Sequence, residues 1–156
     1  MAPTRQELVQ QVGVAMQHYQ RSTEAFDDAV GRALGLNPAD RRCLDRLTDG
    51  PTTAGGLSEA TGLRPAATTT LIDRLAVRGW VRRVRSPTDR RQVLVELTEH
   101  GLARVREAYG PLVEEGARMM AHLSVAELET MREHLDAIRE LTDRHRLRVV
   151  SGSKGS

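Results

Sequence analysis

The sequence predicts a mainly α-helical fold that contains one small β-hairpin. Apolar residues recur at helical spacing along most of the chain, which favours amphipathic helices. The stretch VRRVRSPTDRRQVLVEL, residues 81–97, instead reads as two strands joined by a proline-containing turn. Two short helical segments separated by a glycine come directly before it. Together these observations predict a helix-turn-helix followed by a hairpin, with long helices on either side.

The first helix is expected to begin after Thr4, because the residues from Thr4 to Glu7 form a capping-box pattern. An apolar stripe at helical spacing then continues to about Leu34, where Gly35 offers a stop. The stripe consists of Val9, Val12, Met16, Tyr19, Phe26 and Val30. These features predict one long amphipathic helix.

A second helix is expected after Asn37, which can cap it, with Pro38 at its first position and Asp40 complementing the helix dipole. The stretch DGP at 49–51 ends it. Its apolar face consists of Cys43, Leu44 and Leu47.

The helix-turn-helix pattern follows. Thr52 or Thr53 can cap a short helix that Gly62 ends in a left-handed conformation. Pro65 opens the next helix, which stops at Gly79. The inward apolar residues of this second helix are Leu71, Ile72 and Leu75.

Two further helices are expected after the hairpin. Thr98 can cap the first, and the Gly-Pro pair at 110–111 inside it is expected to produce a kink. Ser124 and Glu127 form another capping box, which opens a final helix that continues to about residue 146.

The order of elements divides the chain into four parts. Residues 1–36 form an N-terminal helix, 37–97 a compact winged helix-turn-helix, 98–147 the C-terminal helices and 148–156 a flexible tail. Each terminal helix carries an apolar stripe that has no obvious partner within a monomer of this size. These helices are therefore expected to be dimerisation helices that pack across a two-fold axis.

Composition narrows the class of protein. Hydrophobic residues make up 39% of the chain and aromatic residues only 3%, which indicates a thin aliphatic core. The net charge of +2 is a weak argument for nucleic acid, but every basic residue except Lys154 is arginine, the side chain suited to phosphate contacts. A GC-rich genome would produce the same arginine bias. The single cysteine excludes an internal disulfide, no apolar run approaches the roughly 20 residues that span a bilayer, and no signal core is present, so a cytoplasmic protein is expected.

The helix after the turn is the candidate for contact with a DNA major groove. Its small residues allow close approach, and threonine hydroxyls and methyl groups can reach phosphates, base edges or thymine methyls. The alternative, that the threonines merely fill a helix, is less favoured because three consecutive β-branched residues are poor helix formers. The expected outward positions are Ala66, Ala67, Thr69, Thr70, Asp73 and Arg74. Thr53 and Arg64 are further candidates, and a phosphate contact would explain an arginine at a cap position.

The hairpin adds a dense group of arginines. Arg82, Arg83 and Arg85 can meet phosphates, and arginines at its tip, Arg90 and Arg91, can enter a minor groove. The alternative is a solvated charged face. Because the arginines directly follow a helix-turn-helix, the DNA-binding interpretation is preferred.

The stretch GLRPAATTTLIDRLAVRGWVRRVRSPTDRRQVLVELTEHG resembles the winged-helix core of the MarR (multiple antibiotic resistance regulator) family of bacterial transcription factors. The triplet at 89–91, the apolar strand after it, and Leu97-Thr98 with Gly101 resemble that family's wing signature. The terminal helices are similar in order and length. The resemblance implies a homodimer that binds palindromic operators in double-stranded DNA.

The resemblance also implies roles for two wing residues. Arg91 would be the wing-tip arginine in the minor groove, and Asp89 would hold its guanidinium. On an extended backbone residues 89 and 91 point the same way, and a carboxylate can bind a guanidinium bidentately. The alternative for Asp89 is an ordinary turn residue after Pro87, and one side chain can serve both roles. The sequence departs from the family pattern at Thr70, where many members carry a longer polar or basic side chain, so the resemblance implies a short or water-mediated major-groove contact there.

Members of the family often respond to small phenolic or other aromatic ligands, and some sense oxidants through cysteine. His18, Tyr19 and Cys43 are candidates for lining a ligand cavity, with a place in the core or the dimer interface as the preferred alternative for Tyr19. Cys43 is interpreted as a buried structural thiol, while three nearby arginines keep a redox sensor open as an alternative. The histidines show no metal-ligand spacing, so neither a metal nor another cofactor is expected.

The combined prediction is a homodimeric transcriptional regulator, a repressor of an adjacent operon that a small-molecule ligand releases. No metal motif, phosphate loop or nucleophile-base set indicates an enzyme. The alternatives are a cysteine-based redox-sensing regulator of the same fold and a protein-interaction module that does not bind DNA.

Overall fold

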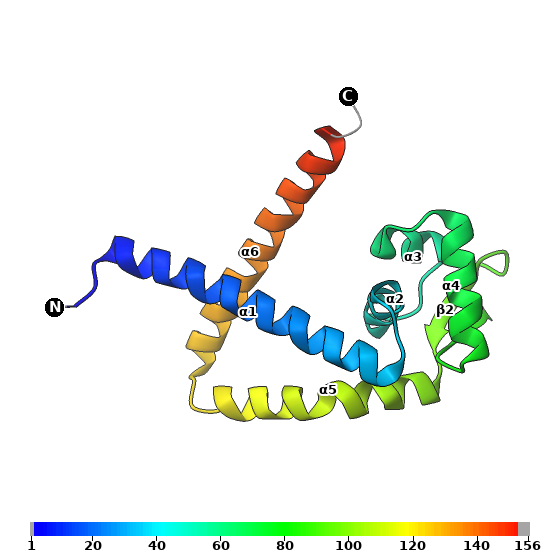
Figure 1. The fold of residues 1–156 in the computed structure, drawn as a ribbon, viewed down its shortest axis with the longest axis horizontal. Coiled ribbons are helices and arrows are strands. Elements are labelled where there is room, and N and C mark those ends of the chain that lie inside the picture. Colours follow the sequence, from blue (N-terminus) through cyan, green and yellow to red (C-terminus); the bar gives the residue numbers. More distant parts are fainter. Residues whose placement is uncertain (1, 153–156) are drawn as a thin grey trace. The chain divides into compact units, whose positions relative to one another are not determined.

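A computed structural model of the chain describes residues 2–152 (Figure 1). The predicted mainly α fold with one hairpin is confirmed. In chain order the elements are α1 (Arg5–Leu34), α2 (Pro38–Thr48), α3 (Ala54–Thr61), α4 (Pro65–Val77), β1 (Val81–Arg85), β2 (Val93–Leu97), α5 (Glu99–Met120) and α6 (Val125–Gly152). The chain forms two compact units, and the boundary falls inside α5, between Gly110 and Pro111. The first unit therefore holds α1 to α4, the hairpin and the start of α5.

The local signals at the helix ends work as the sequence predicts. At α1 the backbone N–H of Thr4 donates to Glu7 Oε2 (2.7 Å) and the N–H of Glu7 donates to the Thr4 hydroxyl (3.3 Å). Ser124 and Glu127 make the same reciprocal pair at α6. Gly35 and Gly62 end their helices with φ of 63° and 71°, a left-handed conformation that only glycine adopts without strain. These signals are local in the chain, which explains why they can be read from it.

The hairpin is antiparallel, with Val81 opposite Leu97 and Arg85 opposite Val93. Thr52 forms an isolated antiparallel β-bridge with Val95 of β2. The N–H of Thr52 donates to the carbonyl of Val95 (3.1 Å), and the carbonyl of Thr52 accepts the N–H of Val95 (2.7 Å). Thr52 is thus a bridge residue, and the cap of α3 is Thr53. The bridge fixes the return strand of the hairpin to the start of the helix-turn-helix.

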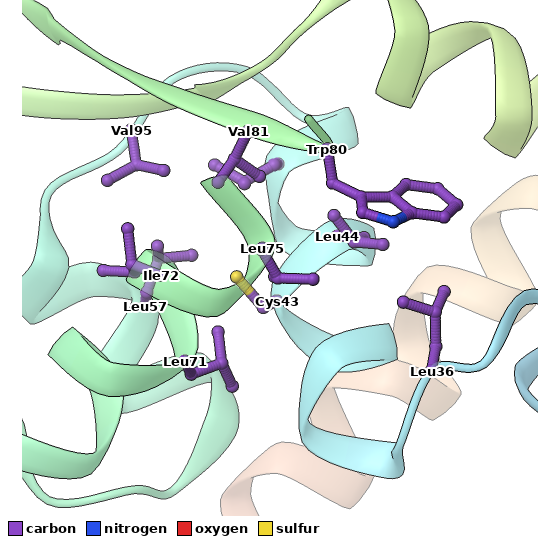
Figure 2. Close-up of a cluster of buried hydrophobic side chains, with 11 residues drawn as sticks. Leu36, Cys43, Leu44, Leu57, Leu71, Ile72, Leu75, Trp80, Val81 and Val95 are labelled. Atoms are coloured by element: carbon purple, nitrogen blue, oxygen red, sulfur yellow. The ribbon is translucent and has the colours of Figure 1, made fainter. Parts of the chain in front are cut away.

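The core of the first unit lies between α2, α3, α4 and the hairpin (Figure 2). Its buried residues are Leu36, Cys43, Leu44, Leu47, Leu57, Leu71, Ile72, Leu75, Trp80, Val81 and Val95. Gly101 closes it at the start of α5: a Cβ there would lie 2.2 Å from the carbonyl oxygen of Trp80. Only glycine allows α5 to approach the backbone of Trp80, directly before β1, this closely.

The last helix is longer than predicted. It continues to Gly152, whereas the sequence indicates an end near residue 146 and a flexible tail from 148. The segment LRVVS at 147–151 contains neither glycine nor proline, so nothing stops the helix before Gly152. Residues 153–156 of the expected tail lie outside the described residues.

Apolar side chains on the long helices stay exposed in the single chain. On α1 they are Leu8, Val9, Val12, Val14, Met16 and Tyr19, and on α6 they include Val125, Leu128, Met131, Leu135 and Leu141. Within residues 2–152, no helix combines the length and the apolar character required to cross a bilayer.

Candidate nucleic-acid interface

Helix α4 exposes the face that the sequence assigns to DNA. The predicted outward residues, Ala66, Ala67, Thr69, Thr70, Asp73 and Arg74, are all exposed. Thr68 is fully buried, which fits its position one helical turn before the inward apolar residues of α4. The threonine run therefore serves both sides of the helix: one member packs in the core and two face outward.

All three threonines hydrogen-bond along their own helix. The hydroxyl groups of residues 68–70 each donate to the carbonyl four positions earlier, at 3.1 Å. A hydroxyl has one hydrogen to donate, so this bond occupies the donor of each threonine. The exposed surface of Thr69 and Thr70 is left with methyl groups and oxygen lone pairs.

Two of the candidate DNA-contacting arginines have partners within the protein. Arg74 forms an ion pair with Asp40, a carboxylate that is only 2% exposed and whose other oxygen accepts the backbone N–H of Asn37 (3.1 Å). Arg83 binds Asp73 on α4 at 2.7 Å. A second hairpin arginine, Arg82, pairs with Glu96 across the strands, also at 2.7 Å. These side chains join the elements of the winged helix to one another.

The remaining candidate arginines have no ion-pair partner among the described residues. Arg64, Arg85, Arg90 and Arg91 are exposed, and none forms an ion pair with any residue that the structure describes. Arg64 stands at the N-cap of α4 without a capping hydrogen bond from its side chain. The other three lie at the end of β1 and in the wing loop, residues 86–92. Unpaired guanidinium groups thus lie at the start of α4 and along the wing.

The wing loop differs from its prediction at Asp89. The expectation of an extended backbone over 89–91 is wrong, because a turn closes there: the N–H of Gln92 donates to the carbonyl of Asp89 (2.9 Å). The Asp89 carboxylate accepts the backbone N–H of Arg91 (2.9 Å) and forms no ion pair with the Arg91 guanidinium. Asp89 is therefore the turn residue of the alternative interpretation, and its side chain shapes the loop that carries Arg90 and Arg91.

Thr53 has a structural role as well. Its hydroxyl accepts the N–H of Gly56 (3.1 Å) and so caps α3. It is half-buried, unlike the exposed threonines of α4. Contact between Thr53 and DNA stays a prediction.

Arg78 is a residue of this region that the sequence does not single out. Its guanidinium donates to the carbonyls of Leu34 and Gly35, both at 2.8 Å, and lies 6.0 Å from the centre of the Trp80 ring. It thereby ties the end of α4 to the end of α1. Its partners lie more than 40 residues earlier, and no local pattern around Arg78 indicates them.

A cavity of about 610 Å³ opens in the first unit between α1, α2 and the start of α5. Its lining includes four carboxylates, from Glu24, Asp27, Asp28 and Asp45, and two arginines, Arg41 and Arg42. One of the arginines is already occupied, because Arg41 binds Asp28 at 2.5 Å. The lining is therefore more acidic than basic.

Two side chains that line this cavity have a raised pKa. Tyr109 donates its hydroxyl to Asp27 (2.9 Å), and burial together with this bond raises the pKa of Tyr109 to about 12. Burial, followed by the negative charges of Asp49 and Asp27, raises the pKa of Asp45 above its usual value. Both shifts follow from burial in an acidic surrounding.

The predicted ligand candidates lie elsewhere. His18 and Tyr19 are exposed on α1 and do not line this cavity, whereas Tyr109, which no sequence pattern marks as a ligand contact, does. Cys43 is completely buried in the core (Figure 2). Burial and the charge of Asp40 raise the pKa of its thiol to about 12. The structural-thiol interpretation is supported, since a sensor needs an accessible thiolate.

The different surroundings of Arg74 and Arg83 lead to a testable difference in stability. Replacing Arg74 with alanine is expected to lower the free energy of unfolding by about 2 kcal/mol, since it leaves the buried carboxylate of Asp40 without its cation. The partly exposed Arg74 keeps the loss below that of a fully buried pair. Arg83→Ala is the matched control: its partner Asp73 is exposed, so less than about 1 kcal/mol should be lost. Urea denaturation at equal protein concentration measures both, and equal losses would contradict the structural role of Arg74.

Comparison with known proteins agrees with this geometry. The model of the MarR family matches residues 34–92. The HTH-type transcriptional regulator YcgE of Bacillus subtilis is 36% identical over 108 residues, which cover 69% of this chain and 70% of the relative. The crystal structure of RV1404 from Mycobacterium tuberculosis is 26% identical, with 90% and 96% of the two chains covered and a TM-score of 0.62. A mutant of MarR from E. coli complexed with operator DNA is 21% identical, with coverage of 87% and 99% and a TM-score of 0.50. The chain belongs to the MarR family of DNA-binding, winged-helix transcriptional regulators.

Proposed function

We propose that the chain is a homodimeric repressor that places α4 in the major groove of its operator and the wing tip in the adjacent minor groove. The observation that carries this proposal is the division of the arginines in the winged helix. Arg74, Arg78, Arg82 and Arg83 have partners in the protein, whereas Arg64, Arg85, Arg90 and Arg91 have none among residues 2–152. Free guanidinium groups on an exposed rim are suited to phosphates and to the negative minor groove.

The main alternative is a protein-interaction module that keeps the winged helix as a scaffold. A scaffold needs the paired arginines, because they hold α1, α2, α4 and the hairpin together. It has no use for unpaired charge on the wing loop. The free arginines therefore favour a polyanionic partner.

The homodimer is supported by the apolar residues that α1 and α6 expose in the single chain. Contiguous exposed apolar residues on long helices usually mark an interface, and a two-fold axis lets one face pack against its own copy. A two-fold dimer presents two copies of α4 and of the wing. We expect it to bind a palindromic operator with half-sites about one helical turn, roughly 10 bp, apart.

Release by a ligand is supported by the cavity beside Tyr109. Its walls come from α1, α2 and α5, and Arg78 joins α1 to the end of α4, so an occupant of the cavity acts on elements that position α4. A ligand shifts such an equilibrium only by its difference in affinity for the two states. The acidic lining favours a cationic or neutral aromatic ligand over an aromatic acid. An adjacent operon is the expected target of repression.

The wing assignment predicts that Arg91→Ala weakens binding to the DNA upstream of the protein's own gene by about tenfold or more. The logarithm of the affinity should also depend less steeply on the logarithm of the salt concentration, because fewer counterions are released. Arg106→Ala is the matched control, since it removes the same charge from an exposed site on α5 without an ion-pair partner in the described part of the chain. Gel-shift titrations at several salt concentrations measure both variants. An unchanged slope and affinity in Arg91→Ala would refute the wing assignment, and a monomer mass by light scattering at micromolar concentration would refute the homodimer.

The hydrogen bond of Asp89 predicts different effects for two substitutions. Asp89→Asn keeps an oxygen that accepts the N–H of Arg91, so specific binding should remain within about twofold of wild type. Asp89→Ala loses the acceptor, loosens the turn and should weaken specific binding several-fold, although it makes the wing more positive. Fluorescence anisotropy with operator and non-operator duplexes separates specific from general effects. If Asp89→Asn weakens binding as much as Asp89→Ala, the negative charge itself is required and the carboxylate clamps a guanidinium in the complex.

The acidic cavity predicts a preference among aromatic probes. Benzyltrimethylammonium should raise the melting temperature and weaken DNA binding, whereas benzoate should do neither at the same concentration. Asp27→Asn removes one negative charge but still accepts the Tyr109 hydroxyl, so it should reduce the effect of the cation several-fold and leave the fold intact. Thermal-shift and gel-shift titrations provide the measurements. A stronger effect of benzoate than of the cation would contradict the assignment.

A further inference from the structure

We infer that α4 recognises its half-site through methyl groups, by contact with the C5-methyl of thymine. The inference rests on the proposed function, in which α4 enters a major groove. It follows from which hydrogen-bonding groups and methyl groups the exposed side chains of α4 can present to a base edge.

Beyond its N-cap residue Arg64, whose free guanidinium the proposed function assigns to phosphate, helix α4 has no free long polar side chain. Between Pro65 and Val77 the long polar residues are Asp73 and Arg74, and both are engaged, with Arg83 at 2.7 Å and with the buried Asp40. Releasing Arg74 to contact a base would leave the Asp40 carboxylate buried without its cation. The bidentate contacts by which arginine reads guanine, or asparagine and glutamine read adenine, are therefore not available from this helix.

The exposed residues that remain are small and carry methyl groups. On Ala66 and Ala67 the methyl is the whole side chain. On Thr69 and Thr70 the hydroxyl hydrogen is donated to the carbonyls of Pro65 and Ala66, both at 3.1 Å. While these bonds persist, neither threonine can donate to the acceptor atoms of guanine, adenine or thymine. What the exposed surface of α4 can offer to DNA is methyl groups and a few oxygen lone pairs.

Thymine is the base that matches such a surface, because its C5-methyl is the apolar group of the major groove. Burying one methyl group changes an affinity by about fourfold, compared with roughly ten- to a hundredfold for a bidentate contact. Recognition by α4 is therefore modest at each base pair and should be spread over more than one thymine. Thr69 and Thr70 are specificity-determining residues in this scheme.

The test uses the full chain and duplexes enriched by it from a random pool. In an enriched duplex each thymine is replaced singly by deoxyuridine, which removes the methyl group and keeps base pairing. We expect one or more positions per half-site at which the Kd rises about fourfold. In the double variant Thr69→Ser with Thr70→Ser, which keeps the hydroxyls and removes the methyls, this uracil penalty should disappear. Thr70→Val, which keeps a methyl and removes the hydroxyl, should retain the penalty.

Arg91→Ala is the matched control, because it weakens binding through the wing and leaves α4 untouched, so its uracil penalty should persist. A penalty that stays the same in the double serine variant would show that Thr69 and Thr70 do not contact the thymine methyls, and would overturn the inference that these two residues read thymine. So would a duplex that binds equally well with every thymine replaced. If the chain enriches no sequence at all, the proposed function fails and this inference fails with it.

Discussion

The position of α4 depends on one buried carboxylate. Asp40 is 2% exposed, and burying an ionised carboxylate is costly unless charge and hydrogen bonds compensate it. One of its oxygens accepts the N–H of Asn37 at the start of α2, and the other binds Arg74 on α4. The start of α2 and the middle of α4 therefore cannot separate without exposing an unpaired charge to the core. The Thr52 bridge to Val95 and the Arg78 bonds to the end of α1 fix the same unit from two further sides.

This arrangement explains why the arginines of the winged helix fall into two groups. A guanidinium that holds two elements together has part of its donors committed inside the protein, so moving it to DNA would break that contact. A guanidinium on the exposed rim gains phosphate contacts without a loss inside the protein. The division also separates two tasks, because the paired arginines make the winged helix rigid and the free ones supply charge. Rigidity matters for binding, since a groove contact is useful only where its position is held.

The sequence predicts the parts of this structure that depend on neighbouring residues. The capping boxes at Thr4 and Ser124, the left-handed glycines and the hairpin follow from patterns a few residues long. The partner of Asp40 lies 34 residues away on α4, and that of Arg78 lies on α1, so neither pair has a local signature. The same reason applies to the Thr52 bridge and to the acidic cavity, whose walls come from three helices. The extended backbone predicted over 89–91 fails for a different reason: the carboxylate of Asp89 itself promotes a turn there, by accepting the N–H of Arg91.

The proposed dimer supplies what a methyl-reading helix lacks. One methyl contact discriminates by only about fourfold, so a single α4 with two such contacts would distinguish its half-site by roughly 16-fold. Two half-sites bound by a rigid dimer multiply these factors, which gives roughly 250-fold. In the proposed complex, the free arginines of the wing would raise affinity for every sequence and add little to this ratio apart from sensitivity to groove width. A regulator with strong non-specific affinity and weak discrimination at each base pair can thus be selective only when two copies of the winged helix are held at a fixed spacing. The exposed apolar faces of α1 and α6 are the surfaces of this chain that can hold them there.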